Sequence, residues 1–448
     1  MDNVPYIFVS IASYRDSELI PTLEDMISRC DNPHALRISI CWQCSGEISI
    51  FLNHGMQLIE KRLHNGFNLY VFHYKKCVIR VISVHYYLSQ GACWARHIAE
   101  TLFDNEKYFL QIDSHCRFIS GWDSEMITML DRLLPHSPKP VITGYPPGYQ
   151  PDKPTEKSGE LIRIIFRGFS PDKILQLSPL VMNEKIDSPI RGSYLAGGFI
   201  FSLGSFVTDI PNDPNIFFEG EEIAMAVRAF THGYDIYHPD KVLLWHFYGR
   251  EEHVKVWSDH GEEAKSKGNI KQAWWERDAS SKKRVNILLG QEKDTQCNLG
   301  MYGLGSQRTL SQFERRAGVH FSTCQVHPDV TGDQHLSYFS CGDLVESEWL
   351  SQLVGIHKKT IEFTPEQIDL LDKNALYWYI AIYTKSNHLI EQKTVYQNEI
   401  EEKMSSSDNS RFSIPVEITS NGSLTPYSVR ICSFSGNSGW GETLEEAW

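Results

Sequence analysis

The sequence contains no long apolar segment. In the 448-residue chain, the longest mostly apolar stretch covers residues 194–207, and glycines and serines interrupt it. A helix that spans a bilayer needs about 20 consecutive, predominantly apolar residues. Residues 1–5 carry no basic group, and no apolar segment typical of a secretion signal follows them. We therefore expect neither a membrane span nor a signal peptide.

The chain is also poor in positive charge. Its 43 Lys and Arg residues stand against 56 Asp and Glu residues, which gives a formal net charge of -13. Nucleic acids and anionic membranes are bound mainly through Lys and Arg, so neither is an expected partner. A small anionic ligand is still compatible with this composition, because a metal ion and one or two arginines can hold it locally.

The ten cysteines do not form a disulfide framework. Six of them lie within the first 116 residues, without the tight, even spacing of small secreted domains. Cys41 and Cys44 form a CxxC pair, but no second pair follows at the spacing of a zinc ribbon. The pair ends an apolar run, which favours buried free thiols over a redox or zinc site. We expect a reducing, cytoplasmic compartment.

The first 250 residues alternate between strand and helix patterns. Nearly continuous apolar runs predict buried strands, and apolar positions three and four apart predict amphipathic helices. The predicted strands cover residues 6–12, 36–42, 68–74 and 108–112, and the clearest helices begin near residues 19, 91, 126 and 222. This alternation predicts an α/β fold, with a parallel sheet covered by helices on both faces.

The pattern changes near residue 335. A chain of this length exceeds one ordinary core, so we divide it into domains 1–335 and 336–448. In the second domain, Thr364 to Gln367 form a helix capping box and residues 376–384 alternate as a strand. Two more strand patterns, 412–418 and 427–434, flank a turn. We predict a small β-rich C-terminal domain that contributes to acceptor or partner binding.

One group of polar residues has metal-ligand chemistry. Asp113 and His115 directly follow the strand 108–112, at the sheet edge where open α/β sheets bind ligands. His246 ends another short strand and is a candidate third ligand. A mixed oxygen and nitrogen set favours Mn²⁺ over Mg²⁺. The alternatives are a capping aspartate with a surface histidine, and a core histidine at position 246.

Several segments in a fixed order resemble a known family. Residues 7–16, 91–96, 111–115, 218–222 and 303–308 carry the resemblance, which spans about residues 6–320. The chain resembles the cytoplasmic GlcNAc-transferases that modify hydroxyproline on a ubiquitin-ligase adaptor protein, together with their bacterial relatives. More distantly, it is similar to the polypeptide N-acetylgalactosaminyltransferases. The C-terminal segment is not covered, and the repeated Gln-x-Trp pattern of the latter enzymes is missing.

The resemblance implies a GT-A-type, Rossmann-like glycosyltransferase domain. It implies transfer of a sugar, GlcNAc first of all, from a UDP-sugar to a hydroxyl group of a protein or glycan, with retention at the anomeric carbon. The DXD-like residues Asp113 and His115, with His246, then hold Mn²⁺ or Mg²⁺. The resemblance places Arg15, Arg96, Asp113 and Arg250 at the donor, and Glu221 and Glu222 near the donor sugar and acceptor.

Other functions are compatible with the same residues. Carboxylates are favoured in the first turn of a helix, so Glu221 and Glu222 have a purely structural alternative. A metal-dependent hydrolase acting on a nucleotide sugar could use the same three ligands. A catalytically inactive sugar-binding protein is a further alternative, although the intact set of candidate residues argues against it.

Overall fold

The computed structural model describes residues 6–184, 186–340, 345–372, 374–406, 412–422 and 424–448. The chain divides into two compact units. The first comprises Met1–Ser322 and His335–Gly342, and the second comprises Thr323–Gln334 and Asp343–Trp448. The boundary is not a single point in the sequence, because residues 323–334 belong to the second unit and residues 335–342 belong to the first.

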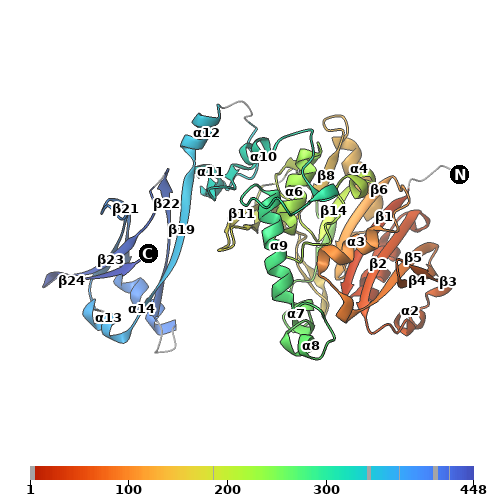
Figure 1. Ribbon diagram of the computed structural model, residues 1–448, viewed down its shortest axis with the longest axis horizontal. Helices are drawn as coiled ribbons and strands as arrows, with labels where there is room; N and C mark the ends of the chain where they lie inside the picture. Colours follow the sequence, from red (N-terminus) through yellow and green to blue (C-terminus); the bar gives the residue numbers. More distant parts are fainter. Residues whose placement is uncertain (1–5, 185, 341–344, 373, 407–411, 423) are drawn as a thin grey trace. The chain divides into compact units, whose positions relative to one another are not determined.

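A ten-stranded sheet forms the centre of the first unit (Figure 1). Its strands, in spatial order, are β13 (Ile190–Arg191), β15 (Asp235–His238), β8 (Pro140–Thr143), β14 (Phe199–Leu203), β6 (Tyr108–Asp113), β1 (Ile7–Tyr14), β2 (Leu36–Cys44), β5 (Cys77–His85), β4 (Phe67–Tyr74) and β3 (Gln57–His64). The four strands β6, β1, β2 and β5 are parallel, with Val9 paired to both Leu110 and Ile38. These four strands are nearly continuous apolar runs, as expected for strands that are buried on both faces of the sheet.

Away from this centre the sheet is mixed, which corrects the expectation of a parallel sheet. β14 runs antiparallel between β6 and β8, and β3, β4 and β5 form two successive hairpins. The hairpin turns have two consecutive residues with positive φ: Asn65 and Gly66 in the first, Lys75 and Lys76 in the second. Such turns match the twist of the strands that they join.

Helices cover both faces of this sheet, as predicted. The helices of the first unit are α1 (Leu19–Arg29), α2 (Ser49–Asn53), α3 (Ala92–Glu100), α4 (Trp122–Leu133), α5 (Ser205–Asp209), α6 (Glu221–Thr231), α7 (Val256–Asp259), α8 (Glu262–Ser266), α9 (Trp274–Leu288) and α10 (Leu310–Ala317). Leu23 of α1 and Trp122 of α4 pack with Val9 in one hydrophobic core. α3 lies on the opposite face, where the Ser39 hydroxyl donates to the Ala99 carbonyl.

Short strands outside the large sheet complete the first unit. They are β7 (Cys116–Phe118) paired with β16 (Leu244–His246), β9 (Tyr149–Gln150) with β10 (Lys153–Lys157), β11 (Leu161–Phe169) with β12 (Leu175–Met182), and β17 (Val319–His320). The region 135–157 contains β8, β9 and β10. The predicted strand before residue 246 is the short β16.

The second unit is built mainly of antiparallel strands around one apolar core. Its elements are β18 (Gln325–Val326), α11 (Pro328–Thr331), α12 (Glu346–Gln352), β19 (Val354–Phe363), α13 (Pro365–Leu370), β20 (Tyr377–Tyr383), β21 (Leu389–Tyr396), α14 (Gln397–Ser406), β22 (Phe412–Asn421), β23 (Ser428–Ser435) and β24 (Gly439–Ala447). β22 pairs with β19, whereas β23 lies between β20 and β24. The α/β fold with a β-rich C-terminal part is thus confirmed. The two strands that flank the predicted turn belong to different sheets.

Two sequence-based expectations concern the described residues as a whole. The nine cysteines within the described ranges are free thiols, including Cys41 and Cys44. Among these residues, no helix is both long enough and apolar enough to cross a membrane.

Candidate active site

Three candidate metal ligands meet at the carboxyl end of β6. Asp113 is the last residue of this strand, and His115 follows two positions later. His246 ends β16, which pairs antiparallel with β7 so that His246 lies opposite Cys116. One ligand atom from each of the three side chains lies within 4.8 Å of the other two. Residues far apart in the sequence therefore form one group that can bind a divalent cation.

A buried carboxylate orients His115. Asp16 lies two residues after the end of β1. Its Oδ2 atom is 2.7 Å from His115 Nδ1 and also accepts a hydrogen bond from the Ser114 hydroxyl at 2.5 Å. Burial raises the pKa of Asp16, but His115 and Arg250 outweigh it and hold this pKa below its usual value. Burial lowers the pKa of His115. When Nδ1 donates to Asp16, the other ring nitrogen, Nε2, keeps a lone pair for a metal ion, as in many metal-binding histidines, although Arg250 Nη1 lies 3.0 Å from it here.

Arg96 connects the metal group to the first turn of α6. Its guanidinium is buried, pairs with Asp113 Oδ1 at 2.9 Å, and also donates to Glu221 Oε1. Burial alone would raise the pKa of Asp113, but the hydrogen bond from His246 and the charge of Arg96 hold it well below its usual range. Asp113 is therefore a carboxylate at neutral pH, as a metal ligand must be.

The environment of Glu222 favours the protonated carboxyl group, in contrast to that of Asp113. Its carboxyl group accepts hydrogen bonds from the Tyr145 hydroxyl at 2.6 Å and from the Gly197 backbone N–H at 2.9 Å. Burial is the largest influence and, together with the nearby charge of Glu221, raises the pKa of Glu222 to about 7 despite these hydrogen bonds. The pKa of Asp113 is held low and that of Glu222 is raised to about 7, so these two carboxyl groups suit different roles in one site.

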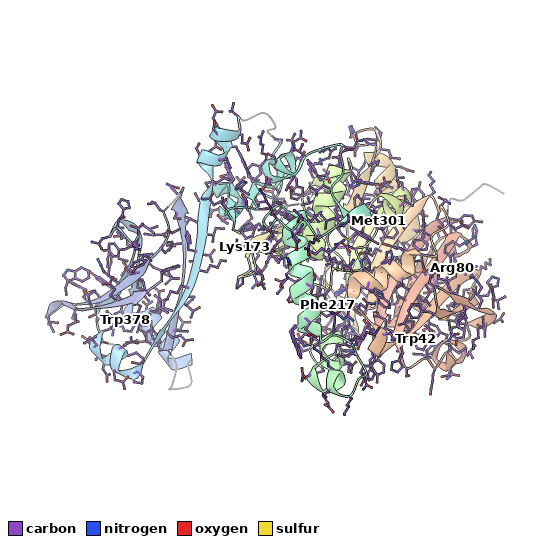
Figure 2. The ribbon with its side chains drawn as sticks, viewed as in Figure 1. Trp42, Arg80, Lys173, Phe217, Met301 and Trp378 are labelled. Carbon is purple, nitrogen blue, oxygen red and sulfur yellow. The ribbon has the colours of Figure 1, made fainter. Side chains whose placement is uncertain are left out.

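Two cavities adjoin at the metal group: Asp113 and His246 line both of them, whereas His115 lines only the first. The first has a volume of about 390 Å³ and includes Asp16, His115, Arg250 and Trp257 in its lining. The second has a volume of about 360 Å³ and is lined in part by Tyr145, Arg167, Gln176, Glu221 and Glu222. Both linings contain Arg96, Asp113, Phe218, His246 and Tyr248. Figure 2 labels Phe217, which belongs to the lining of the first cavity.

Glycines bring the backbone close to these side chains. A Cβ atom on Gly198 would lie 2.7 Å from Asp113 Oδ2, and one on Gly197 would collide with Glu221 Oε1. The segment before β14 can therefore pass the carboxylates only without side chains at these two positions.

The two remaining predicted arginines occupy different environments. Arg250 lies inside the first cavity, with Nη2 at 3.1 Å from Asp16 and Nη1 at 3.0 Å from His115 Nε2. Arg15 is more exposed. It pairs with Asp259 at 2.8 Å and places its guanidinium 4.6 Å from the centre of the Tyr86 ring. Arg15 is not among the residues that line either cavity, although its neighbours Tyr14 and Asp16 line the first.

Sequence reasoning missed three residues that complete the site. Asp16 orients His115, Tyr145 holds Glu222, and Asp259 binds both the Tyr14 hydroxyl and Arg15. Only Asp16 had a usable signal. It follows a buried strand just as Asp113 does, and the two strands β1 and β6 are neighbours in the sheet.

Comparison with known proteins identifies the family. Residues 6–66 and 67–323 match the family described as Glycosyltransferase (GlcNAc), so the chain belongs to this glycosyltransferase family and is an enzyme of that class. A search of curated protein sequences gives no match.

Three solved structures with detectable similarity have low sequence identity to this chain. GalNAc-T7 with UDP, GalNAc and Mn²⁺ is 11% identical, with 99% of this chain and 72% of that chain covered and a TM-score of 0.45. Staphylococcus aureus TarS is 10% identical, with 99% and 85% covered and a TM-score of 0.37. Its fragment 1–349 is 12% identical, with 65% and 77% covered and a TM-score of 0.35.

Proposed function

We propose that this enzyme transfers GlcNAc from UDP-GlcNAc to a hydroxyl group of a protein or glycan, with retention at the anomeric carbon and with Mn²⁺ or Mg²⁺ as cofactor. The observation that carries the proposal is the position of Asp113, His115 and His246 where two cavities adjoin. One cavity accommodates the nucleotide and the other accommodates the acceptor, so the donor sugar lies between them.

The residues present fit a divalent ion. Asp113 is ionised, and the hydrogen bond to Asp16 sets the tautomer of His115. The Nδ1 atom of His246 is buried and has no hydrogen-bond partner among the described residues, while its Nε2 lies 3.2 Å from Asp113 Oδ2. When bound, such an ion neutralises the charge that develops on a leaving diphosphate.

The chain's own groups supply binding and orientation. In the first cavity, Arg250 and Lys255 are cations available to the diphosphate, once Arg250 turns from Asp16 and His115. In the second, Glu222 can accept a hydrogen bond from an acceptor hydroxyl or hold a proton, because its pKa is about 7. Attack from the face that the diphosphate leaves gives retention without a covalent bond to the enzyme, with the leaving phosphate taking the hydroxyl proton.

The nine free thiols support a cytoplasmic location.

A screen of nucleotide sugars tests the proposal. The purified chain is incubated with UDP-GlcNAc, UDP-GalNAc, UDP-glucose and GDP-mannose in Mn²⁺, and the released nucleoside diphosphate is measured with and without EDTA. We expect the fastest turnover with UDP-GlcNAc, and loss of this turnover in EDTA. Preference for another donor, or turnover that survives EDTA, would overturn the proposal. Water-dependent turnover that no hydroxyl acceptor accelerates would instead identify a hydrolase.

A further inference from the structure

The sheet β21-β20-β23-β24 of the second unit has two chemically different faces. Along β20, Trp378, Ile380 and Ile382 point inward and belong to the apolar core, and Figure 2 labels Trp378. Successive side chains of a strand point to opposite faces, so Tyr377 and Tyr379 lie on the outer face. The outer face therefore carries large aromatic rings that are not part of the apolar core.

These rings form a continuous row across all four strands. Tyr377 is paired in register with Tyr396 of β21 and Phe434 of β23, and Phe434 is paired with Trp440 of β24. The ring centres lie 6.2 Å apart for Tyr377 and Tyr396, 5.2 Å for Tyr377 and Phe434, and 5.1 Å for Phe434 and Trp440. Tyr379 also contacts Trp440, at 5.9 Å. We call these five residues the aromatic platform.

The platform remains accessible at both ends of the row. Trp440 and Tyr396 are each 57% exposed, although both are large and apolar enough to be buried. Large rings that contact one another at the surface are typical of binding surfaces rather than of scattered exposed residues. Because neighbouring strands are about 4.8 Å apart, a row across four strands is roughly 14 Å long.

The polar groups beside the platform indicate an uncharged ligand. Arg430, on the same face, is engaged by Glu445 at 3.2 Å and lies 4.5 Å from the Tyr383 ring. The Tyr379 hydroxyl donates to Gln392, so hydroxyl and amide groups border the rings. An engaged arginine offers little to a phosphate backbone or an anionic lipid.

We propose that the aromatic platform binds a neutral oligosaccharide by stacking sugar rings on its two exposed members, Tyr396 and Trp440. The C–H bonds on one face of a pyranose are weakly positive and are attracted to the negative faces of aromatic rings. The hydroxyl groups at the edge of the sugar then bind to water and to side chains such as Gln392. That this glycan carries the acceptor hydroxyl rests on the proposed function, whereas its binding does not.

Calorimetry on the full chain tests the binding. The probes are neutral tetrasaccharides of glucose, N-acetylglucosamine, galactose and mannose, in α- and β-linked forms. We expect at least one to bind, and Trp440→Ala and Tyr396→Ala each to weaken it about tenfold, similar to the loss of one aromatic stacking partner for a nucleic-acid base. Tyr427→Ala is the matched control, since Tyr427 is 55% exposed in the same unit but outside the platform. It should bind as wild type does.

Two further measurements separate the possible failures. Thermal unfolding of the second unit should be unchanged in all three variants, which excludes a folding defect of that unit, and donor hydrolysis without acceptor should also be unchanged. If no tetrasaccharide binds, or if Trp440→Ala binds as wild type does, the proposal is wrong. If sedimentation shows a dimer that Trp440→Ala dissociates, the platform binds a second copy and the proposal is also wrong. If UDP-GlcNAc is not turned over but platform-dependent glycan binding persists, the proposed function fails and the platform assignment stands.

Discussion

The two units differ in what they bury. Within the described residues, every buried acidic, basic or histidine side chain belongs to the first unit, including Asp16, Arg96, His115 and Glu221. The buried polar residues of the second unit are Thr384, Ser420, Ser428 and Ser433, and its core cluster is apolar. Burying a charge costs free energy unless it is paired, so a buried ionic network indicates a function that requires it. The second unit has no such network, and we therefore look for its function on its surface.

The largest effect should come from removing the carboxylate at the centre of the buried network. Asp113→Asn keeps the size of the side chain and an oxygen that can accept from Arg96. It removes the negative charge with which Asp113 would bind a divalent cation. We therefore expect the rate of sugar transfer to fall at least about 1,000-fold. The measurement is the rate of UDP release in saturating Mn²⁺. Glu60→Gln, on the exposed strand β3, is a control that should not change the rate. A folded Asp113→Asn enzyme with normal turnover would contradict the assignment of the ligand.

A substitution in the apolar core of the second unit should have the opposite effect: it should lower stability and leave donor hydrolysis unchanged. Trp378 is fully buried between Phe363 and Phe412, and truncating it to alanine should cost about 3–5 kcal/mol in the free energy of unfolding of this unit. Donor hydrolysis should remain, because the residues that line the two cavities belong to the first unit. The test is thermal unfolding followed by UDP release at a temperature below the first transition. Loss of both properties together would show that the units are not independent.

The sequence was informative where function depends on the ends of strands. Asp113 and His115 follow one apolar run and His246 ends another. Their convergence depends on the pairing of β7 with β16, but all three could be predicted as candidate ligands from the sequence. The interactions of their neighbours could not, because the contact of Asp16 with His115 depends on which strands are adjacent in the sheet.

Two features of the fold show where sequence patterns have limits. The hairpin at Asn65-Gly66 had a recognisable turn signal, and missing it led to the incorrect expectation of a parallel sheet throughout. The strands β22 and β23 follow each other in sequence, but they pair in separate sheets that enclose the core from two sides. Local pattern predicts each strand, whereas packing of the apolar faces decides its partner.

A smaller effect is expected from Asp16, which would act on the proposed metal ion by orienting His115. Asp16→Asn should weaken Mn²⁺ binding about 10- to 100-fold, as is usual for residues that orient a ligand. The activity should recover as Mn²⁺ is raised, which distinguishes this variant from Asp113→Asn. The rate of UDP release, measured over a range of Mn²⁺ concentrations, gives both the apparent Mn²⁺ affinity and the activity at saturating Mn²⁺. A loss that Mn²⁺ cannot restore would mean that Asp16 has another role in the reaction.

The buried carboxyl group of Glu222 should make the stability of the first unit depend on pH. Its pKa rises from 4.5 in the unfolded chain to about 7 in the folded one, so the folded state binds more protons between these values. Stability should therefore fall as the pH rises from 5 to 8, and this group should contribute roughly 2 kcal/mol to the decrease. Glu222→Gln should reduce that pH dependence while keeping an acceptor for the Gly197 N–H. Denaturant unfolding at both pH values is the measurement. An unchanged slope would show that Glu222 ionises at its ordinary pKa.

The smallest effect should come from Arg15, which carries a charge in the first unit but lies outside the buried network. Its guanidinium pairs with Asp259 and lies over the Tyr86 ring, with a side chain that is 35% exposed. Exposed ion pairs contribute about 0–1 kcal/mol, so Arg15→Ala should raise the KM for UDP-GlcNAc less than about fivefold and leave kcat unchanged. Arg96→Ala is the informative counterpart. It removes an equal charge that is buried and paired with both Asp113 and Glu221, so these carboxylates would be left facing each other without a cation. Steady-state kinetics on both variants compares them directly. A larger loss for Arg15 than for Arg96 would show that contact with the donor, rather than burial, decides which charges this enzyme needs.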